Sequence, residues 1–228
     1  MEKMIVKSND IVRDVYILDG RSGCCSDDPL VPEAIPHKIV VERDAKVEIV
    51  ILIMPGMSCD LKMDVTLAGE GAEANIYGAY VCGGDEKVRI AVDMHHDVPH
   101  CNSRQLFKGI AGGSSRVDFY GKIIVAQDAQ RTEAYQENHN ILLSDGAKVD
   151  TKPQLEIYAD DVKCSHGATI GRLNEEEQFY MRSRGISLED AKVLQMISFI
   201  APVLENIQDE SQRDKIFSEF ESNIRRMV

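Results

Sequence analysis

The feature that most constrains the fold is a long series of short apolar runs between residues 38 and 171. The runs contain Val, Ile, Leu and Tyr, and Gly, Asp or Asn interrupts the series every few residues. Short β-branched runs bounded by turn-forming residues are typical of strands. No helical period intrudes in this region, so we expect a mainly β core. The expected strands are 46–53, 62–67, 75–81, 88–92 and 116–125.

A weak internal repeat accompanies these strands. A small residue that follows Asp, Gly or Ser precedes several of them, at Ala45, Ala72, Ser115, Ala129 and Ala147. The spacing is uneven, which is typical of a solenoid whose rungs vary in length. A β-helix and a β-sandwich both explain many short strands with few helices. The irregular repeat favours the β-helix.

The pattern changes to helical after residue 171. Asn174 precedes three glutamates, an arrangement that caps and stabilises a helix N-terminus. Gly185 ends that helix, and Ser187 begins a second one in the manner of a capping box. Pro202 should kink the second helix or mark its last turn, and residues 209–228 form a final charged helix. We therefore divide the chain into N-terminal strands and a loop (1–37), a β core (38–172) and a helical segment (173–228).

The second helix carries an apolar surface too broad to face water. One explanation is that the helices cap the open end of the β core, which a solenoid requires. Another is that this surface binds a partner. The residues on its central stripe that would then form the interface are Leu194, Ile197, Ala201 and Leu204.

Composition excludes several classes of function. The chain has 228 residues and a formal net charge of -12, which argues against nucleic acid as a partner because phosphate binding needs clustered Lys and Arg. It lacks both an apolar run of transmembrane length and a signal-peptide core, so we expect no membrane insertion and a cytoplasmic location. Six cysteines without zinc-type spacing predict mostly buried thiols. Cys24 and Cys25 fall in a loop rich in Gly, Asp and Pro.

The main candidates for metal binding are Cys164 and His166. They lie at the end of a run whose pattern predicts a β-strand. Because side chains two positions apart on a strand share one face, Cys164 and His166 can face one ligand together. Thiolate and imidazole are suitable donors for iron. Two ligands do not close a site, so a second chain would have to supply the others. His139 is a third candidate, although a hydrogen-bonded role in its own strand is equally open.

A second metal-like cluster contains His95, His96 and His100. It suggests a rival function, a metal-dependent enzyme built on a β-solenoid with bound zinc. His96 and His100 have a chelating spacing for a helix, but Pro99 between them disfavours a helix here. A structural or solvated strand is therefore the favoured interpretation of this cluster.

The segment 137–169, which contains KCSHGAT at 163–169, and the segment FYMRSRGI at 179–186 resemble the C-terminal core of the SufB/SufD family of iron–sulfur cluster assembly proteins. The likeness is strongest to the SufD branch, because SufB-type relatives carry a cysteine near the position of His139. It covers residues 100–200 best. The family has a helical N-terminal domain and more solenoid ahead of this core.

This resemblance implies a right-handed parallel β-helix and a non-catalytic scaffold role. It also implies a SufB-like subunit or a second copy of the chain as partner, with His166 at the contact where a nascent cluster forms. The cluster would be transient and shared between subunits, with no cofactor bound stably. The helices, through the stripe at Leu194 to Leu204, would dock a SufC-like ATPase. Consistent with an external ATPase, the sequence contains no phosphate-binding loop of its own.

Overall fold

A computed structural model describes residues 3–19 and 35–228. The predicted loop at Cys24 and Cys25 lies outside the described residues. Strands and helices form in the order that the sequence indicates, with the strands first. The strands are β1 (Lys3–Val6), β2 (Ile11–Leu18), β3 (Lys38–Val41), β4 (Lys46–Ile53), β5 (Cys59–Leu67), β6 (Glu73–Cys82), β7 (Lys87–His96), β8 (Asn102–Ala111), β9 (Arg116–Val125), β10 (Glu133–Leu142), β11 (Lys148–Ile157) and β12 (Lys163–Gly171).

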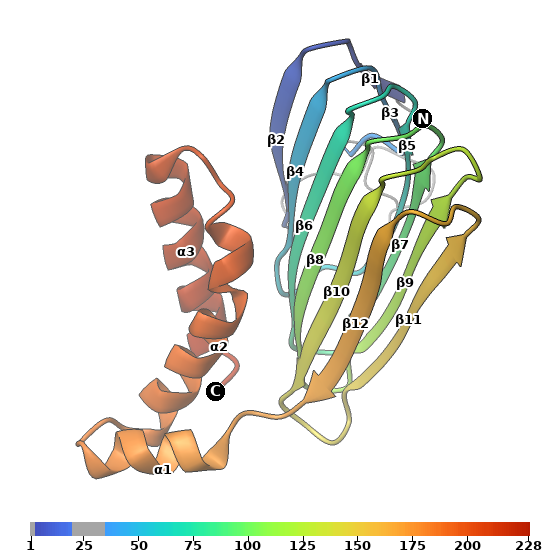
Figure 1. The fold of residues 1–228 in the computed structure, drawn as a ribbon. Helices are drawn as coiled ribbons and strands as arrows, with labels where there is room; N and C mark the ends of the chain where they lie inside the picture. Colours follow the sequence, from blue (N-terminus) through green and yellow to red (C-terminus); the bar gives the residue numbers. More distant parts are fainter. Residues whose placement is uncertain (1–2, 20–34) are drawn as a thin grey trace.

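The strands form two parallel sheets that face each other. The odd-numbered strands make one sheet in the order β1-β3-β5-β7-β9-β11, and the even-numbered strands make the other in the order β12-β10-β8-β6-β4-β2. Successive strands therefore alternate between sheets, and each strand pairs with the strand one turn away (Figure 1). A β-sandwich would have antiparallel pairs. The expected mainly β fold, a parallel β-helix followed by helices, is confirmed.

The turns of the solenoid are uneven in length, which explains the weak repeat in the sequence. Glu73 pairs with Asn102, Asn102 with Glu133, and Glu133 with Lys163. Rungs in this sheet thus differ by a residue or two. The small residues that marked the repeat occupy corners between strands, four of them immediately before a strand and Ala129 a few residues before β10, and each is at least 95% buried. They are Ala45, Ala72, Ser115, Ala129 and Ala147.

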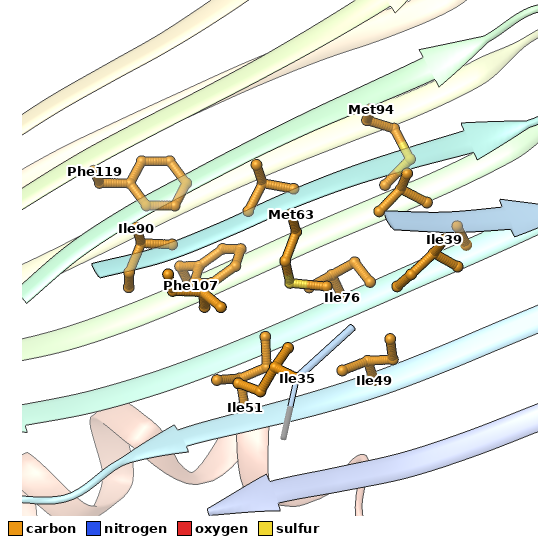
Figure 2. Packing of buried hydrophobic residues seen from close by; sticks show 14 of the residues in the cluster. Ile35, Ile39, Ile49, Ile51, Met63, Ile76, Ile90, Met94, Phe107 and Phe119 are labelled. Carbon is orange, nitrogen blue, oxygen red and sulfur yellow. The ribbon is translucent and has the colours of Figure 1, made fainter. Parts of the chain in front are cut away.

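Aliphatic and aromatic side chains fill the space between the two sheets (Figure 2). Alternate residues of each strand point inward, so parallel pairing stacks like side chains in columns. Ile49 of β4 stacks on Ile76 of β6, and Phe107 of β8 meets Phe119 of β9 across the interior at a ring-centroid distance of 5.0 Å. This interior cluster runs the length of the solenoid and stabilises both sheets.

The C-terminal segment forms α1 (Glu175–Ser183), α2 (Leu188–Leu204) and α3 (Glu210–Arg225). The predicted caps are present: Asn174 accepts hydrogen bonds from two backbone amides of α1, and Ser187 accepts one from Asp190. Pro202 lies in the last turn of α2. Among the described residues, no helix is long and apolar enough to cross a membrane.

The helices α2 and α3 cover the outer face of the even-numbered sheet, so the expectation that the helices cap the open end is wrong (Figure 1). α2 and α3 pack on outward residues of β4, β6 and β8, including Val50, Tyr77 and Leu106. A parallel sheet is normally buried on both faces, and the outward positions in the second half of these strands are mostly apolar. The broad apolar surface of α2 is thus explained within one chain.

This packing also corrects the expected partner interface. Ile197 is 9% exposed and Leu204 1% exposed, both against the sheet, so neither is free to bind another protein. Ala201 is half-buried. Leu194 alone of the predicted stripe is exposed, at 49%.

One end of the solenoid is open. β11 and β12 are the last strands of their sheets, and among the described residues each pairs on one side only. Most residues of β12 are exposed, and Ile157, Tyr158 and Ile170 leave large apolar surface in contact with water. Backbone groups along these two edges are available to another chain.

The tight contact between β6 and β8 predicts a stability effect at Gly109. A Cβ atom at this position would overlap the ring of Tyr80 and lie 2.6 Å from Asn140 Oδ1. We expect Gly109→Ala to lower the free energy of unfolding by about 1–3 kcal/mol, the usual cost of overpacking a core. Gly167→Ala, whose Cβ would meet nothing within 4 Å, should change it by less than about 0.5 kcal/mol. Urea unfolding measures both, and equal values would contradict this account.

Candidate functional site

Cys164 and His166 face the interior of the solenoid at its open end. In the register between β10 and β12, Ala134 pairs with Cys164 and Gln136 with His166. Ala134 and Gln136 are both fully buried between the sheets, and stacked residues of parallel strands share a face. The two predicted ligands therefore lie side by side on the inner face of the last strand.

The open end makes this pair accessible. Cys164 is half-buried and packs on the interior cluster, while His166 is exposed because no further strand lies above it. Burial raises the pKa of the Cys164 thiol above its usual value, and a backbone hydrogen bond with Ala134 partly offsets this rise. The His166 side chain forms no hydrogen bond or ion pair with any residue that the structure describes. Among the described residues the His166 imidazole is therefore uncommitted, while the Cys164 thiol retains its backbone hydrogen bond with Ala134.

The structure does not bring His139 to this pair. Inward and outward residues alternate along β10, and His139 is on the outer face, opposite to Cys164 and His166. Its ring lies 2.8 Å from Thr169 Oγ1 and 3.3 Å from Glu137 Oε2. This arrangement is the hydrogen-bonded ladder that the sequence left open. A single ion held by Cys164 and His166 would not reach His139.

The histidines of the rival metal site also diverge. His96 is fully buried between the sheets, where its Nε2 lies 2.8 Å from Ser103 Oγ. His95 points to the outer face of β7, with Asp64 at 3.9 Å, and His100 lies in a corner, 3.9 Å from Glu70. In residues 3–19 and 35–228, no three His, Cys, Asp or Glu side chains form a group that could hold a metal ion.

The interior becomes polar just below the open end, which the sequence analysis missed. Tyr80, Asn138 and Asn140 form a closed network in which each side chain bonds to the other two. Beside it, Gln136 Nε2 donates to Gln105 Oε1 at 3.0 Å. The signal was the alternation of β10, where the three inward positions after Ala134 are amides and only the last, Leu142, is apolar. Buried polar networks of this kind specify one arrangement of the core.

A groove of about 850 Å³ opens between α1, α2 and the end of β10. Gln195 of α2 ties the two helices together through hydrogen bonds to Glu177 and Gln178. The exposed ring of Tyr180 lines it, at 59% exposure. The groove is lined by Ile141, Arg172, Leu173, Asn174, Glu176, Glu177, Tyr180, Met181, Leu194, Gln195, Ser198 and Phe199.

Comparison with known proteins identifies the fold family. The family model "SUF system FeS cluster assembly, SufBD core domain" matches residues 33–199, which cover the solenoid from its second turn, α1 and most of α2. The chain belongs to the SufB/SufD family. Its members assemble iron–sulfur clusters, so the resemblance seen in the motifs at 137–169 and 179–186 is confirmed.

Several SufB/SufD relatives are similar over part of the chain. The iron–sulfur cluster assembly protein SufD of Escherichia coli is 48% identical over 125 residues, which cover 55% of this chain and 30% of the relative. A SufBD family protein of Synechocystis is 47% identical over 109 residues, covering 48% of this chain and 24% of the relative. A chloroplastic protein of Arabidopsis thaliana is 34% identical over 175 residues, covering 76% and 37%. The chain thus spans less than half the length of each of these three relatives.

Buried His96 predicts a pH dependence of stability in this SufB/SufD family member. Burial, and secondarily the neighbouring His95, lower the pKa of His96 from 6.5 to about 4. The unfolded chain therefore binds a proton below pH 6.5 that the folded chain does not accept until about pH 4. The contribution of His96 to the free energy of unfolding is complete above pH 6.5 and is lost as the pH falls toward about 4. The loss is on the order of 3 kcal/mol.

The measurement compares the wild type with His96→Gln, which keeps a hydrogen-bonding group for Ser103 but does not titrate. Urea unfolding between pH 7 and pH 4 should show a steeper loss of stability for the wild type. Parallel curves would show that His96 does not cause the dependence.

Proposed function

We propose that this chain is a non-catalytic scaffold component of iron–sulfur cluster assembly that holds part of a nascent cluster at the open end of its solenoid. The observation that carries the proposal is the position of Cys164 and His166, which lie together on the inner face of the last rung and remain open to solvent. Family membership supports iron–sulfur chemistry. The cluster is cargo in this proposal, not a resident cofactor.

The donor set of one chain is incomplete. A thiolate and an imidazole provide two ligands, and iron–sulfur centres accept both kinds of donor. In the described part of the chain no third His, Cys, Asp or Glu joins them. We therefore propose that a second polypeptide supplies the remaining ligands, and that the cluster is shared and transient. His139 serves its own strand through Glu137 and Thr169.

The second polypeptide is a SufB-like subunit or another copy of this chain. The free edges of β11 and β12 support this pairing, because an added strand satisfies unpaired backbone groups and extends the sheet. Such pairing would also cover Ile157 and Ile170, which are 40% and 46% exposed. It would bring the partner's side chains directly over Cys164 and His166.

We further propose that a SufC-like ATPase docks at the groove between α1 and α2. The groove combines apolar residues with both charges, a mixture suited to a protein partner of intermediate polarity. Leu194 and Tyr180 line it and are the exposed apolar anchors. ATP hydrolysis by that partner in the cytoplasm would drive assembly, since this chain carries no phosphate-binding loop.

Removal of the His166 imidazole should impair cluster assembly specifically. We expect His166→Ala to reduce cluster formation by about tenfold or more, because losing a ligand costs at least as much as losing a residue that orients one. The measurement is anaerobic reconstitution with a SufB-like subunit and a SufC-like ATPase, followed by iron and sulfide analysis and cluster transfer to an apoprotein.

His139→Gln is the matched control, because it changes a histidine on the opposite face of the same sheet. It should leave assembly unchanged. If His166→Ala assembles and transfers clusters as well as the wild type, the chain is a structural subunit that holds the ATPase without touching iron, and the ligand proposal fails.

A positive charge in the groove should weaken ATPase docking. Leu194 is 49% exposed and lines the groove, so Leu194→Lys should lower affinity for a SufC-like ATPase by about tenfold or more without unfolding the chain. Ile11→Lys makes the same change at a site on β2 that is 58% exposed and should bind normally. Calorimetric titration measures both, and equal affinities would place the ATPase elsewhere.

A further inference from the structure

Two buried glutamines lie in the same column as His166. Parallel pairing stacks Ile49, Ile76, Gln105, Gln136 and His166 on successive rungs of one sheet. Asp14 of β2, which is half-buried and pairs with Ile49, begins this column. The next two rungs are aliphatic, and the two rungs directly below the histidine carry amides. Gln105 and Gln136 are each 0% exposed. The fully buried polar residues of this column therefore lie directly below His166.

The two amides satisfy each other incompletely. Gln136 Nε2 donates to Gln105 Oε1 at 3.0 Å. Gln136 Oε1 and Gln105 Nε2 have no hydrogen-bond partner in the structure. A buried polar atom without a partner costs about 1–3 kcal/mol, and another isoleucine, as at Ile76, would avoid that cost. The two amides are therefore retained at a cost that an aliphatic pair would not carry.

The opposite sheet makes room for this amide. Gly121 of β9 faces Gln136 across the interior, and a Cβ atom there would lie 2.7 Å from Gln136 Cδ and overlap its amide nitrogen. The absence of a side chain at Gly121 therefore lets the carboxamide lie flat between the sheets. The space opposite Gly121 therefore accommodates the side chain of Gln136.

His166 lies on the rung next to Gln136 and has no hydrogen-bond partner among the described residues. It pairs with Gln136 in the register of β10 and β12, one rung nearer the open end. A histidine that binds a metal through one ring nitrogen almost always donates its other N–H to a fixed acceptor, which sets the tautomer and the ring orientation. The nearby amides of Asn138 and Asn140 are already committed to Tyr80 and to each other.

We infer that Gln136 is a positioning residue for His166. Its free carboxamide oxygen accepts the N–H of one imidazole nitrogen, while Gln105 holds the amide from the opposite side. His166 is exposed and pairs with Gln136 in the register, so the inferred contact requires rotation of the imidazole about its side-chain bonds. The second ring nitrogen is thereby left unprotonated and directed to the open end, where the partner chain docks. The inference rests on the proposed role of His166 as a donor.

The test is a measurement of the His166 tautomer in the full chain without metal. Protein labelled with ¹⁵N at histidine gives the tautomer from the ring nitrogen shifts at pH 8, with His166→Asn used for assignment. We expect one dominant tautomer whose N–H exchanges slowly with water. Gln136→Met, which keeps length and volume but removes the acceptor, should give a mixture of tautomers and exchange faster by about tenfold or more.

Two further variants separate positioning from structure. Gln136→Glu retains an acceptor oxygen and should keep the single tautomer. Thr151→Val removes a different buried hydroxyl that also lacks a partner, from the last rung of the opposite sheet, and should leave His166 unchanged. If Gln136→Met does not fold, Gln136→Asn replaces it, since that variant keeps an amide but withdraws its oxygen by one methylene.

An unchanged tautomer and exchange rate in a folded Gln136 variant would overturn the inference. A change caused by Thr151→Val instead would also overturn it, because the acceptor would then lie on β11. Neither result depends on cluster assembly, so the role of His166 as a donor is tested separately. Conversely, failure of His166→Ala to affect assembly would leave the tautomer measurement interpretable.

Discussion

The structure depends on the parallel register between strands one turn apart. This register stacks each side chain on another of the same face, so a column is wholly inside or wholly outside the solenoid. Ile49 and Ile76 belong to an inner column that runs from Asp14 to His166, and Ala134 lies directly below Cys164. The chemistry of the last rung is therefore connected to the packing of the core by direct stacking.

The stacking of rungs ends at β11 and β12. Interior positions of the final rung are covered from one side only, which leaves His166 exposed and Cys164 half-buried although both face inward. The free edges of β11 and β12 lie at the same place. Unpaired backbone, an uncommitted imidazole and exposed apolar residues thus coincide, and an added strand would satisfy all three. Incompleteness at this end favours function through association.

The candidate site was only partly predictable. The two-residue spacing of Cys164 and His166 was sufficient to place them on one face, because strand geometry is local. His139 could not be assigned to the opposite face without the phase of β10, and His95 and His96 diverge for the same reason. Ile197 and Leu204 were apolar enough to bind a partner, but the outer face of the even-numbered sheet already covers them. The buried amides of Gln105 and Gln136 looked like ordinary polar strand residues.

The sequence by itself determined the local elements, since turn formers, caps and apolar alternation act over a few residues. Asn174, Ser187 and Pro202 each occupy the helical position that their chemistry predicts. Only the tertiary structure decided which faces meet. Strands pair with strands about 30 residues away, and this pairing depends on corner lengths that vary from turn to turn. Whether the apolar surface of α2 packs on a partner or on the chain's own sheet depends on the position of α2 in the fold. Such contacts are settled by the summed packing of distant segments, which no short stretch of sequence records.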